Sequence, residues 1–174
     1  MVNVEAAVAV CPGCGLQMPP AARAHYDGYY HTSAECWSVY TEVLAAEFAN
    51  VVLFGAVHQL TVDTYALQHA GGDHKAKSVC VHLVGLHLQI EEGVASPHVA
   101  RRLKTYAERV DRFGIWPTFT PPSERASLNV FDVAMAADPQ EHADVVRRWS
   151  CEVWDTWHEA HDEVAGIVYS QGLI

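Results

Sequence analysis

Basic residues are scarce in this sequence. Its 174 residues include 11 lysines and arginines against 21 aspartates and glutamates, so the formal net charge is −10. Such a charge is repelled by phosphate backbones and by anionic lipid surfaces, which argues against a general nucleic-acid or membrane-surface binder. We therefore expect neither nucleic acid nor a membrane among its partners.

Long apolar runs and targeting signals are also missing. No stretch approaches the roughly 20 apolar residues of a membrane-spanning helix. The first residues, MVNVEAAVAV, lack a basic region and contain Glu5, so they do not predict a secretory signal peptide. Half of the residues are hydrophobic and 18% are charged, which is typical of a globular domain. We expect a globular protein of the cytoplasm.

An even number of cysteines, which a fully paired disulfide framework needs, is also absent. The five cysteines are Cys11, Cys14, Cys36, Cys80 and Cys151. In a reducing cytoplasm, a CxxC pair more often binds a metal or cycles as a redox pair than forms a structural disulfide. Cys80 and Cys151 lie inside helical patterns, and we expect both to be small buried side chains.

Strand patterns are sparse, whereas helix signals follow one another after residue 32. Thr32 to Glu35 has the pattern of a capping box, with Thr32 as the N-cap. Apolar periodicity, caps and glycine stops predict helices over residues 33–50, 56–70, 75–92, 96–110, 130–137 and 138–169, with a loop over 111–128. We predict an all-α protein of one structural domain. A small irregular zinc-knuckle lobe over residues 1–32 precedes a single bundle of about five or six helices over residues 33–174.

The stretch CPGCG, from Cys11 to Gly15, is the strongest local motif. A tetrahedral zinc site needs thiolates on a tight turn, so that two sulfurs converge on one ion, and the glycines of this stretch permit such a turn. Cys36 is the expected third ligand, because it lies in the first turn of a helix, where the helix dipole stabilises a thiolate.

Two histidines compete for the fourth position. His31 lies five residues before Cys36, and His25 is the alternative further back in the same loop. With either one, the ligands make a closed Cys3His zinc site, which holds the N-terminal lobe on the bundle and leaves no position open for catalysis. The other interpretations are a redox pair, for which the usual βαβ setting is missing, and unligated cysteines.

Histidine is abundant, with 11 residues, and several lie on apolar helix faces. His58, Tyr65 and His69 fall near one line of the second expected helix, His82 lies in the third, and His161 lies in the last. Facing helices of a bundle can each contribute one inward polar group to a site. We therefore put forward the hypothesis that His69, His82 and His161 converge on a buried polar site, with His58 and Asp63 nearby.

This buried site would act on a small organic substrate in one of two ways. If a second metal binds, His69, His82 and His161 are its proposed ligands, with an open position for water. If none binds, His82 or His69 acts as a general base, oriented by Asp63 or Tyr65. The simpler alternative is that each histidine is a core residue satisfied by one hydrogen bond. Four further histidines, His74, His87, His98 and His142, are expected at the surface.

The motifs together resemble an uncharacterised bacterial family, a domain of unknown function. They are the CPGCG stretch, the pair Cys36-Trp37, the segment TVDTYALQH from Thr61 to His69, and Val81-His82-Leu83. The resemblance implies that Asp63, Tyr65, Gln68, His69 and His82 belong together. Family members usually carry an H-x-Y element nine residues before the CW cysteine. Asp27 occupies that position here, so His25 or His31 would have to substitute.

Three functions therefore stand at this stage. The first is an enzyme with a structural zinc ion and a histidine-rich site for a small-molecule substrate. The second is a non-catalytic, zinc-stabilised binding module whose acidic surface contacts a basic partner. The third is a redox sensor that uses Cys11 and Cys14.

Overall fold

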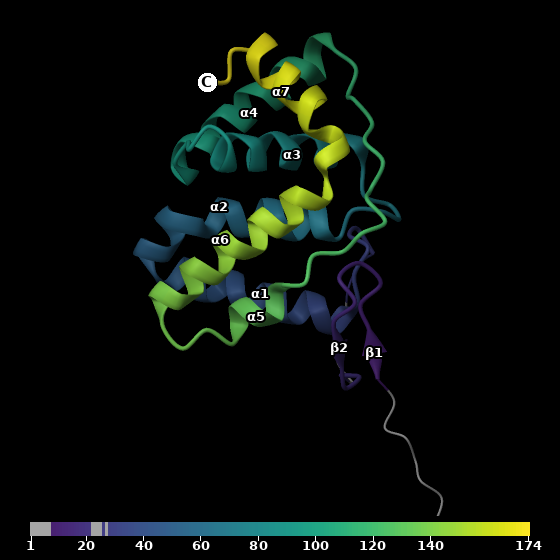
Figure 1. Cartoon of the computed structure of the whole chain (residues 1–174), viewed down its shortest axis with the longest axis vertical. Coiled ribbons are helices and arrows are strands. Elements are labelled where there is room, and N and C mark those ends of the chain that lie inside the picture. The colour runs from purple at the N-terminus through teal and green to yellow at the C-terminus, as the bar shows by residue number, and fades with distance from the viewer. Residues whose placement is uncertain (1–7, 22–25, 27) are drawn as a thin grey trace, which may run out of the picture.

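The computed structural model describes residues 8–21, 26 and 28–174 of the chain, and helices make up most of it (Figure 1). Two short strands, β1 (Ala9–Val10) and β2 (Gln17–Met18), pair near the N-terminus. The helices are α1 (Ala34–Ala49), α2 (Val51–Gln68), α3 (Ala76–Ile90), α4 (Ser96–Phe113), α5 (Val130–Ala134), α6 (Pro139–Thr156), a 3₁₀ turn η1 (His158–Ala160) and α7 (His161–Ser170). The prediction of an all-α fold with a small N-terminal lobe is confirmed.

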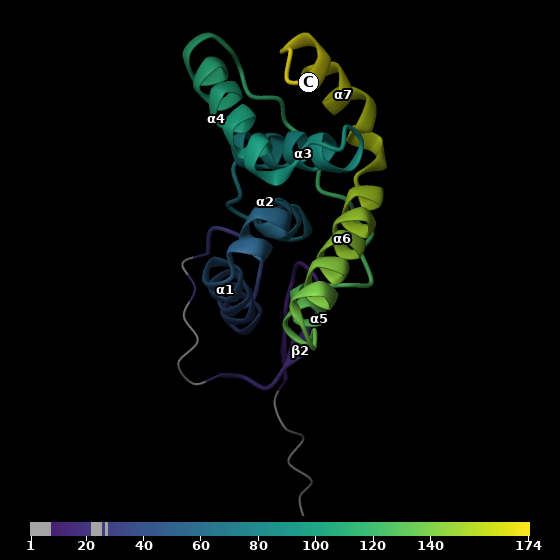
Figure 2. The ribbon, with the colours of Figure 1, turned by 90° about the vertical axis from the view of Figure 1, so that its left-hand side faces the viewer.

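Helix α2 occupies the centre of the structure. It packs against α1, α3, α4 and α6. Figures 1 and 2 show α1, α2 and α3 at successive levels, with α6 running across them and α4 and α7 beside α3 at the far end. A helix contacted on several sides must be apolar on several sides, and α2 buries Leu53, Val57, Leu60, Tyr65 and Leu67.

Helix α4, unlike α2, is apolar on one side only. Its buried residues Val99, Leu103 and Tyr106 recur at helical spacing and face the core, while Arg101 and Lys104 are exposed to solvent. This is the pattern of a helix that covers one side of a core. Within the described ranges, none of the helices has the length and apolar character that crossing a membrane requires.

The start of α1 differs from the predicted capping box. Ser33 is the N-cap, and its Oγ accepts a hydrogen bond from the Cys36 N–H at 3.2 Å. The Thr32 hydroxyl instead lies 2.9 Å from the Tyr65 hydroxyl, and the Glu35 carboxylate accepts from the Ala21 N–H. The side chains of Thr32 and Glu35 therefore make contacts elsewhere in the fold, and Ser33 provides the cap.

The join between α1 and α2 is shorter than predicted. Residues 51–55, expected as a linker, are the first turn of α2. Asn50 alone separates the two helices, and its Oδ1 accepts from the Val52 and Leu53 N–H groups at 3.0 and 3.3 Å. A capping asparagine thus allows the chain to reverse without a loop.

The last predicted helix, 138–169, is interrupted at Trp157. In a continuous helix the Trp154 carbonyl would accept from the His158 N–H. It accepts instead from the Trp157 N–H at 2.9 Å and from Nε2 of His161 at 3.0 Å. This break raises the number of α-helices in the described part of the chain to seven, above the predicted five or six.

Candidate metal centre

The CPGCG stretch forms the turn of the small hairpin. Strand residues Ala9 and Val10 pair with Met18 and Gln17, and the intervening residues form a knuckle. The Cys11 N–H donates to the Leu16 carbonyl at 2.8 Å, and the Gly15 N–H donates to the Cys11 carbonyl at 2.9 Å. Gly15 has a φ of +81°, which residues with a side chain rarely adopt. The turn carries both cysteine side chains toward the bundle.

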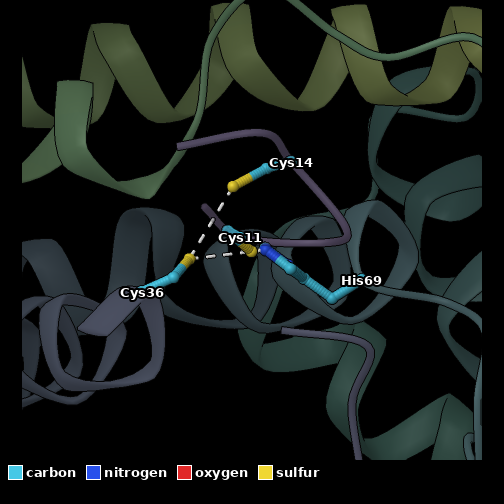
Figure 3. Close-up of side chains that lie close together, drawn as sticks. All are labelled: Cys11, Cys14, Cys36 and His69. Atoms are coloured by element: carbon cyan, nitrogen blue, oxygen red, sulfur yellow. Dashed lines mark hydrogen bonds between the residues drawn. The ribbon is translucent and has the colours of Figure 1, made fainter. Parts of the chain in front are cut away.

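Four buried side chains meet beneath this knuckle. Cys11 and Cys14 come from the turn, Cys36 from the first turn of α1, and His69 from the C-cap of α2 (Figure 3). Their ligand atoms all lie within 4.8 Å of one another. Four soft or borderline donors in one buried cluster could hold a metal ion.

The spacing of these atoms matches the edges of a tetrahedron. The Cys14 and Cys36 sulfurs are 3.7 Å apart, and the Cys36 sulfur lies 3.5 Å from Nε2 of His69. Around a tetrahedral zinc ion, bonds of about 2.3 Å to sulfur and about 2.0 Å to nitrogen place two sulfurs about 3.8 Å apart and a sulfur and a nitrogen about 3.5 Å apart. The cluster therefore has room for one metal ion of zinc size at its centre.

Hydrogen bonds fix the ring of His69 for this role. Its Nδ1 lies 2.8 Å from the Tyr65 carbonyl. A carbonyl can only accept, so Nδ1 carries a proton and Nε2 faces the sulfurs. The Tyr65 hydroxyl donates to the Cys36 sulfur at 3.8 Å, and the Thr32 hydroxyl lies 3.4 Å from the Cys11 sulfur. These second contacts orient three of the four ligands.

The knuckle is seated closely on the end of α2. A Cβ added to Gly13 would lie 2.5 Å from the His31 carbonyl oxygen and 2.6 Å from Cδ2 of His69, so only glycine fits there. On the other side, the Arg125 guanidinium donates to the Pro12 carbonyl at 2.9 Å. The loop before α5 and the C-terminus of α2 thus hold the turn from two sides.

The cysteine thiols and the His69 imidazole shift one another's pKa values. Hydrogen bonds from Cys14 and Cys36 hold the pKa of the Cys11 thiol well below its usual range, while Cys11, Cys36 and burial raise the pKa of the Cys14 thiol. Burial disfavours a charged His69, but hydrogen bonds to the Cys11 and Cys36 sulfurs outweigh it and raise the pKa of His69 to about 9. The groups share protons because three close thiolates repel, and a divalent cation would replace those protons.

The fourth residue of the cluster is His69 and not the predicted His31. His31 is exposed, and its backbone N–H donates to the His69 carbonyl at 2.9 Å. His25 lies outside the described residues. His69, predicted to serve a separate catalytic site, lies at the cluster because α1 and α2 have 16 and 18 residues and reverse at Asn50. Two helices of nearly equal length bring the end of the second back to the start of the first.

The histidines predicted to converge lie in separate surroundings. His69 belongs to the cysteine cluster. His82 lies in α3, with Nδ1 2.8 Å from the Asp63 carboxylate. His161 stacks on Trp154 and donates to its carbonyl, and His58 bonds to Glu47 at 2.8 Å. The hydrogen bonds thus give each ring a different set of partners, and a single site formed by His69, His82 and His161 stays a prediction.

Asp63 is the centre of its own buried network. Its carboxylate accepts from Gln59, His82 and Gln89 at 2.8–3.0 Å. Burial raises the pKa of Asp63 in spite of these donors, of which His82 is the strongest. Tyr65, the other predicted orienting residue, points its hydroxyl at Thr32 and Cys36 instead. The structure thus keeps Asp63 and His82 together and assigns Tyr65 to the cysteine cluster.

Several expectations about exposure are also corrected. Of the four histidines predicted at the surface, His98 is exposed, whereas His74, His87 and His142 are buried. His142 is held by the Glu47 carboxylate, a partner 95 residues away that sequence spacing does not reveal. Cys80 is buried as expected, but Cys151 is exposed.

The fold and the cluster define a helical protein with an N-terminal Cys3His group that could hold a metal ion. The chain belongs to the family of unknown function DUF5946, whose sequence model matches residues 9–158. The match begins at β1 and ends within η1, so it includes all four residues of the cluster. Comparison with curated proteins gave no significant match, and comparison with solved structures gave none either.

Proposed function

We propose that the Cys3His cluster binds one structural zinc ion, which clasps the N-terminal hairpin onto the junction of α1 and α2. The observation that carries the proposal is the geometry of the four donor atoms, all within 4.8 Å of one another and all on buried residues. Three thiolates and an imidazole complete a tetrahedron, so no position stays open for water or substrate. The ion would therefore stabilise the fold and take no part in catalysis.

The measurement that tests this is metal content by mass spectrometry on the chain purified without an affinity tag. We expect about one zinc per chain, in keeping with a single tetrahedral site. His69→Gln and Cys14→Ser should lose the metal and much of the stability, because binding free energy at a structural site is folding free energy. The matched control His31→Gln should keep its zinc, since His31 is exposed.

Two results would overturn the assignment. Zinc that persists in His69→Gln and is lost in His31→Gln would return the fourth position to the loop before α1. A zinc-free wild-type chain with a reversible disulfide between Cys11 and Cys14 would favour a redox sensor instead.

A second candidate function is general-base catalysis by His82, and the Asp63–His82 hydrogen bond favours it. A fully buried carboxylate holds Nδ1 of His82 at 2.8 Å, while the His82 side chain retains 13% exposure. A carboxylate that orients an imidazole is the arrangement of many general bases. The Asp63–His82 pair would then act independently of the zinc.

Hydrolysis of p-nitrophenyl acetate tests this second candidate. We expect the rate to fall by about 100-fold in His82→Gln, the usual scale of general-base catalysis. His158→Gln is the control, because His158 is exposed and bonds to the Asp155 carbonyl rather than to a carboxylate. Equal rates in the wild type and His82→Gln would leave Asp63–His82 as a structural pair.

A further inference from the structure

A cavity of about 370 Å³ lies between α1, α5 and the start of α6. Its apolar walls are formed by Val43 of α1, Leu53 of α2 and Val133 of α5. Two exposed alanines, Ala46 and Ala134, lie at its edge. The volume suits a small organic molecule, and mostly apolar walls with a few polar groups are typical of ligand sites.

His142 is the buried polar residue that lines this cavity. It is 8% exposed, and its Nε2 lies 3.0 Å from Oε1 of Glu47. A carboxylate accepts, so Nε2 carries the proton and Nδ1 is left as an acceptor. Within the described part of the chain, Nδ1 has no hydrogen-bond partner. The ring therefore offers the cavity one unused acceptor.

The Glu47 carboxylate, which holds His142 at the cavity, is itself fixed by several donors. It is 0% exposed, and besides His142 it accepts from the Thr61 hydroxyl at 2.6 Å and from Nδ1 of His58 at 2.8 Å. Donors from α2 and α6 thus satisfy a carboxylate from α1. A buried carboxylate with this many donors is fixed in place, and it fixes the His142 ring in turn.

The charges around the cavity have one sign. Glu42 and Asp138 contribute carboxylates, and no lysine or arginine is among the described residues that line it. The C-terminal turn of α1 also lies here, with no basic residue to balance the negative end of its dipole. At the start of α6, Asp138 accepts from the Glu141 N–H, so a carboxylate already balances the positive end of that dipole.

We propose that this cavity binds a small molecule with a compact apolar body and a protonated amine. The apolar body lies against Val43, Leu53 and Val133. The amine lies at the acidic side of the cavity, where Glu42 attracts it and Nδ1 of His142 accepts a hydrogen bond from it. The proposal does not depend on the zinc ion, because none of the four ligands lines this cavity.

An NMR titration of the zinc-loaded full chain tests the proposal with phenethylamine as the probe. We expect saturable binding with a dissociation constant of about 1 mM or tighter. Phenylacetate, which has the same ring and the opposite charge, should not saturate below about 10 mM. The Cε1–H resonance of His142 should shift with the amine, while that of the exposed His158 should not.

Two tryptophan substitutions on α1 supply a matched pair of variants. Ala46→Trp fills the cavity from its edge and should weaken phenethylamine binding at least about tenfold. Ala45→Trp places the same ring on the adjacent exposed position outside the cavity and should leave the dissociation constant unchanged. Glu42→Gln should raise the constant about threefold, as expected for one exposed charge.

The proposal fails if phenylacetate binds as tightly as phenethylamine, if Ala46→Trp binds the amine as the wild type does, or if no saturation occurs. Zinc content measured on each variant separates this failure from failure of the proposed clasp, because the two sites share no residue.

Discussion

At the scale of single residues, the close contact between Gly85 and Asp63 is the most demanding in the core. Gly85 lies in the middle of α3, directly against the Asp63 carboxylate of α2. A Cβ at this position would overlap the carboxylate, coming within 3.0 Å even of its more distant oxygen. Gln59, His82 and Gln89 hold the carboxylate in place, so it cannot turn aside. This explains a glycine in a helix interior, where it is otherwise unfavourable.

Gly85→Ala should therefore destabilise the protein by about 2–3 kcal/mol in urea unfolding, because a methyl group is forced into a filled core. Gly166→Ala is the control. Gly166 is also inside a helix, α7, but it has no atom within 4 Å of its added Cβ, so alanine there should stabilise by about 0.5–1 kcal/mol. If Gly85→Ala proved as harmless as Gly166→Ala, the Asp63 network would have to be more mobile than its contacts indicate.

At the scale of elements, α2 owes its central position to the segment TVDTYALQH. The resemblance in sequence implied that the polar residues of this segment belong together. The structure pairs Asp63 with His82 and brings Tyr65 and His69 to Cys36, while Thr61 and Gln68 have other partners. A segment with this many side-chain partners should tolerate little substitution. Thr61 contacts Glu47 of α1, Asp63 contacts His82 of α3, Tyr65 contacts Thr32, Gln68 contacts Trp149 of α6, and His69 contacts Cys36.

The reversal between α1 and α2 is a second property of elements, and it depends on one side chain. Asn50 ends α1 and caps α2 through its Oδ1. Asn50→Ala removes an acceptor from two N–H groups and should lower the free energy of unfolding by about 1 kcal/mol. Asn50→Asp, which preserves the capping oxygen, should stay within about 0.5 kcal/mol of the wild type in the same urea titration. Equal losses in both variants would show that the cap is not the stabilising contact.

At the scale of the whole molecule, the cysteine cluster and the far helices occupy opposite ends. The cluster joins the hairpin to α1 and α2, while α4 and α7 each pack on α3 beyond α2 (Figure 2). Local stability in a protein follows such contiguous units. Loss of the metal should therefore weaken one end of the molecule more than the other.

Hydrogen exchange with and without a zinc chelator measures this difference. We expect chelation to remove protection from residues 9–18 and from the start of α1, while the amides of α3 and α7 keep most of theirs. Cys14→Ser without chelator should give the same pattern, because it removes one ligand from the same centre. Uniform loss of protection would mean that the clasp supports the entire fold cooperatively.

Much of the architecture could be predicted from the sequence because the relevant physics is local. Apolar periodicity, caps and glycine stops act within a few residues, and they indicated the all-α class and most of the helices. The same holds for Cys11, Cys14 and Cys36, since a CPGCG turn and a cysteine in the first turn of a helix are visible in the chain itself.

The remaining features depend on which distant segments meet, and only the tertiary structure decides that. His69 replaces His31 beside the cysteines because α2 returns along α1, and His142 is buried because α6 brings it to Glu47. The histidines expected to cluster have different hydrogen-bond partners for the same reason: residues on one face of a helix meet different neighbours once several helices surround it. The sequence alone determined most of the helices and the three cysteines of the cluster. Packing decided the fourth ligand, the two buried carboxylate–histidine pairs and the cavity, because those depend on distances across the fold.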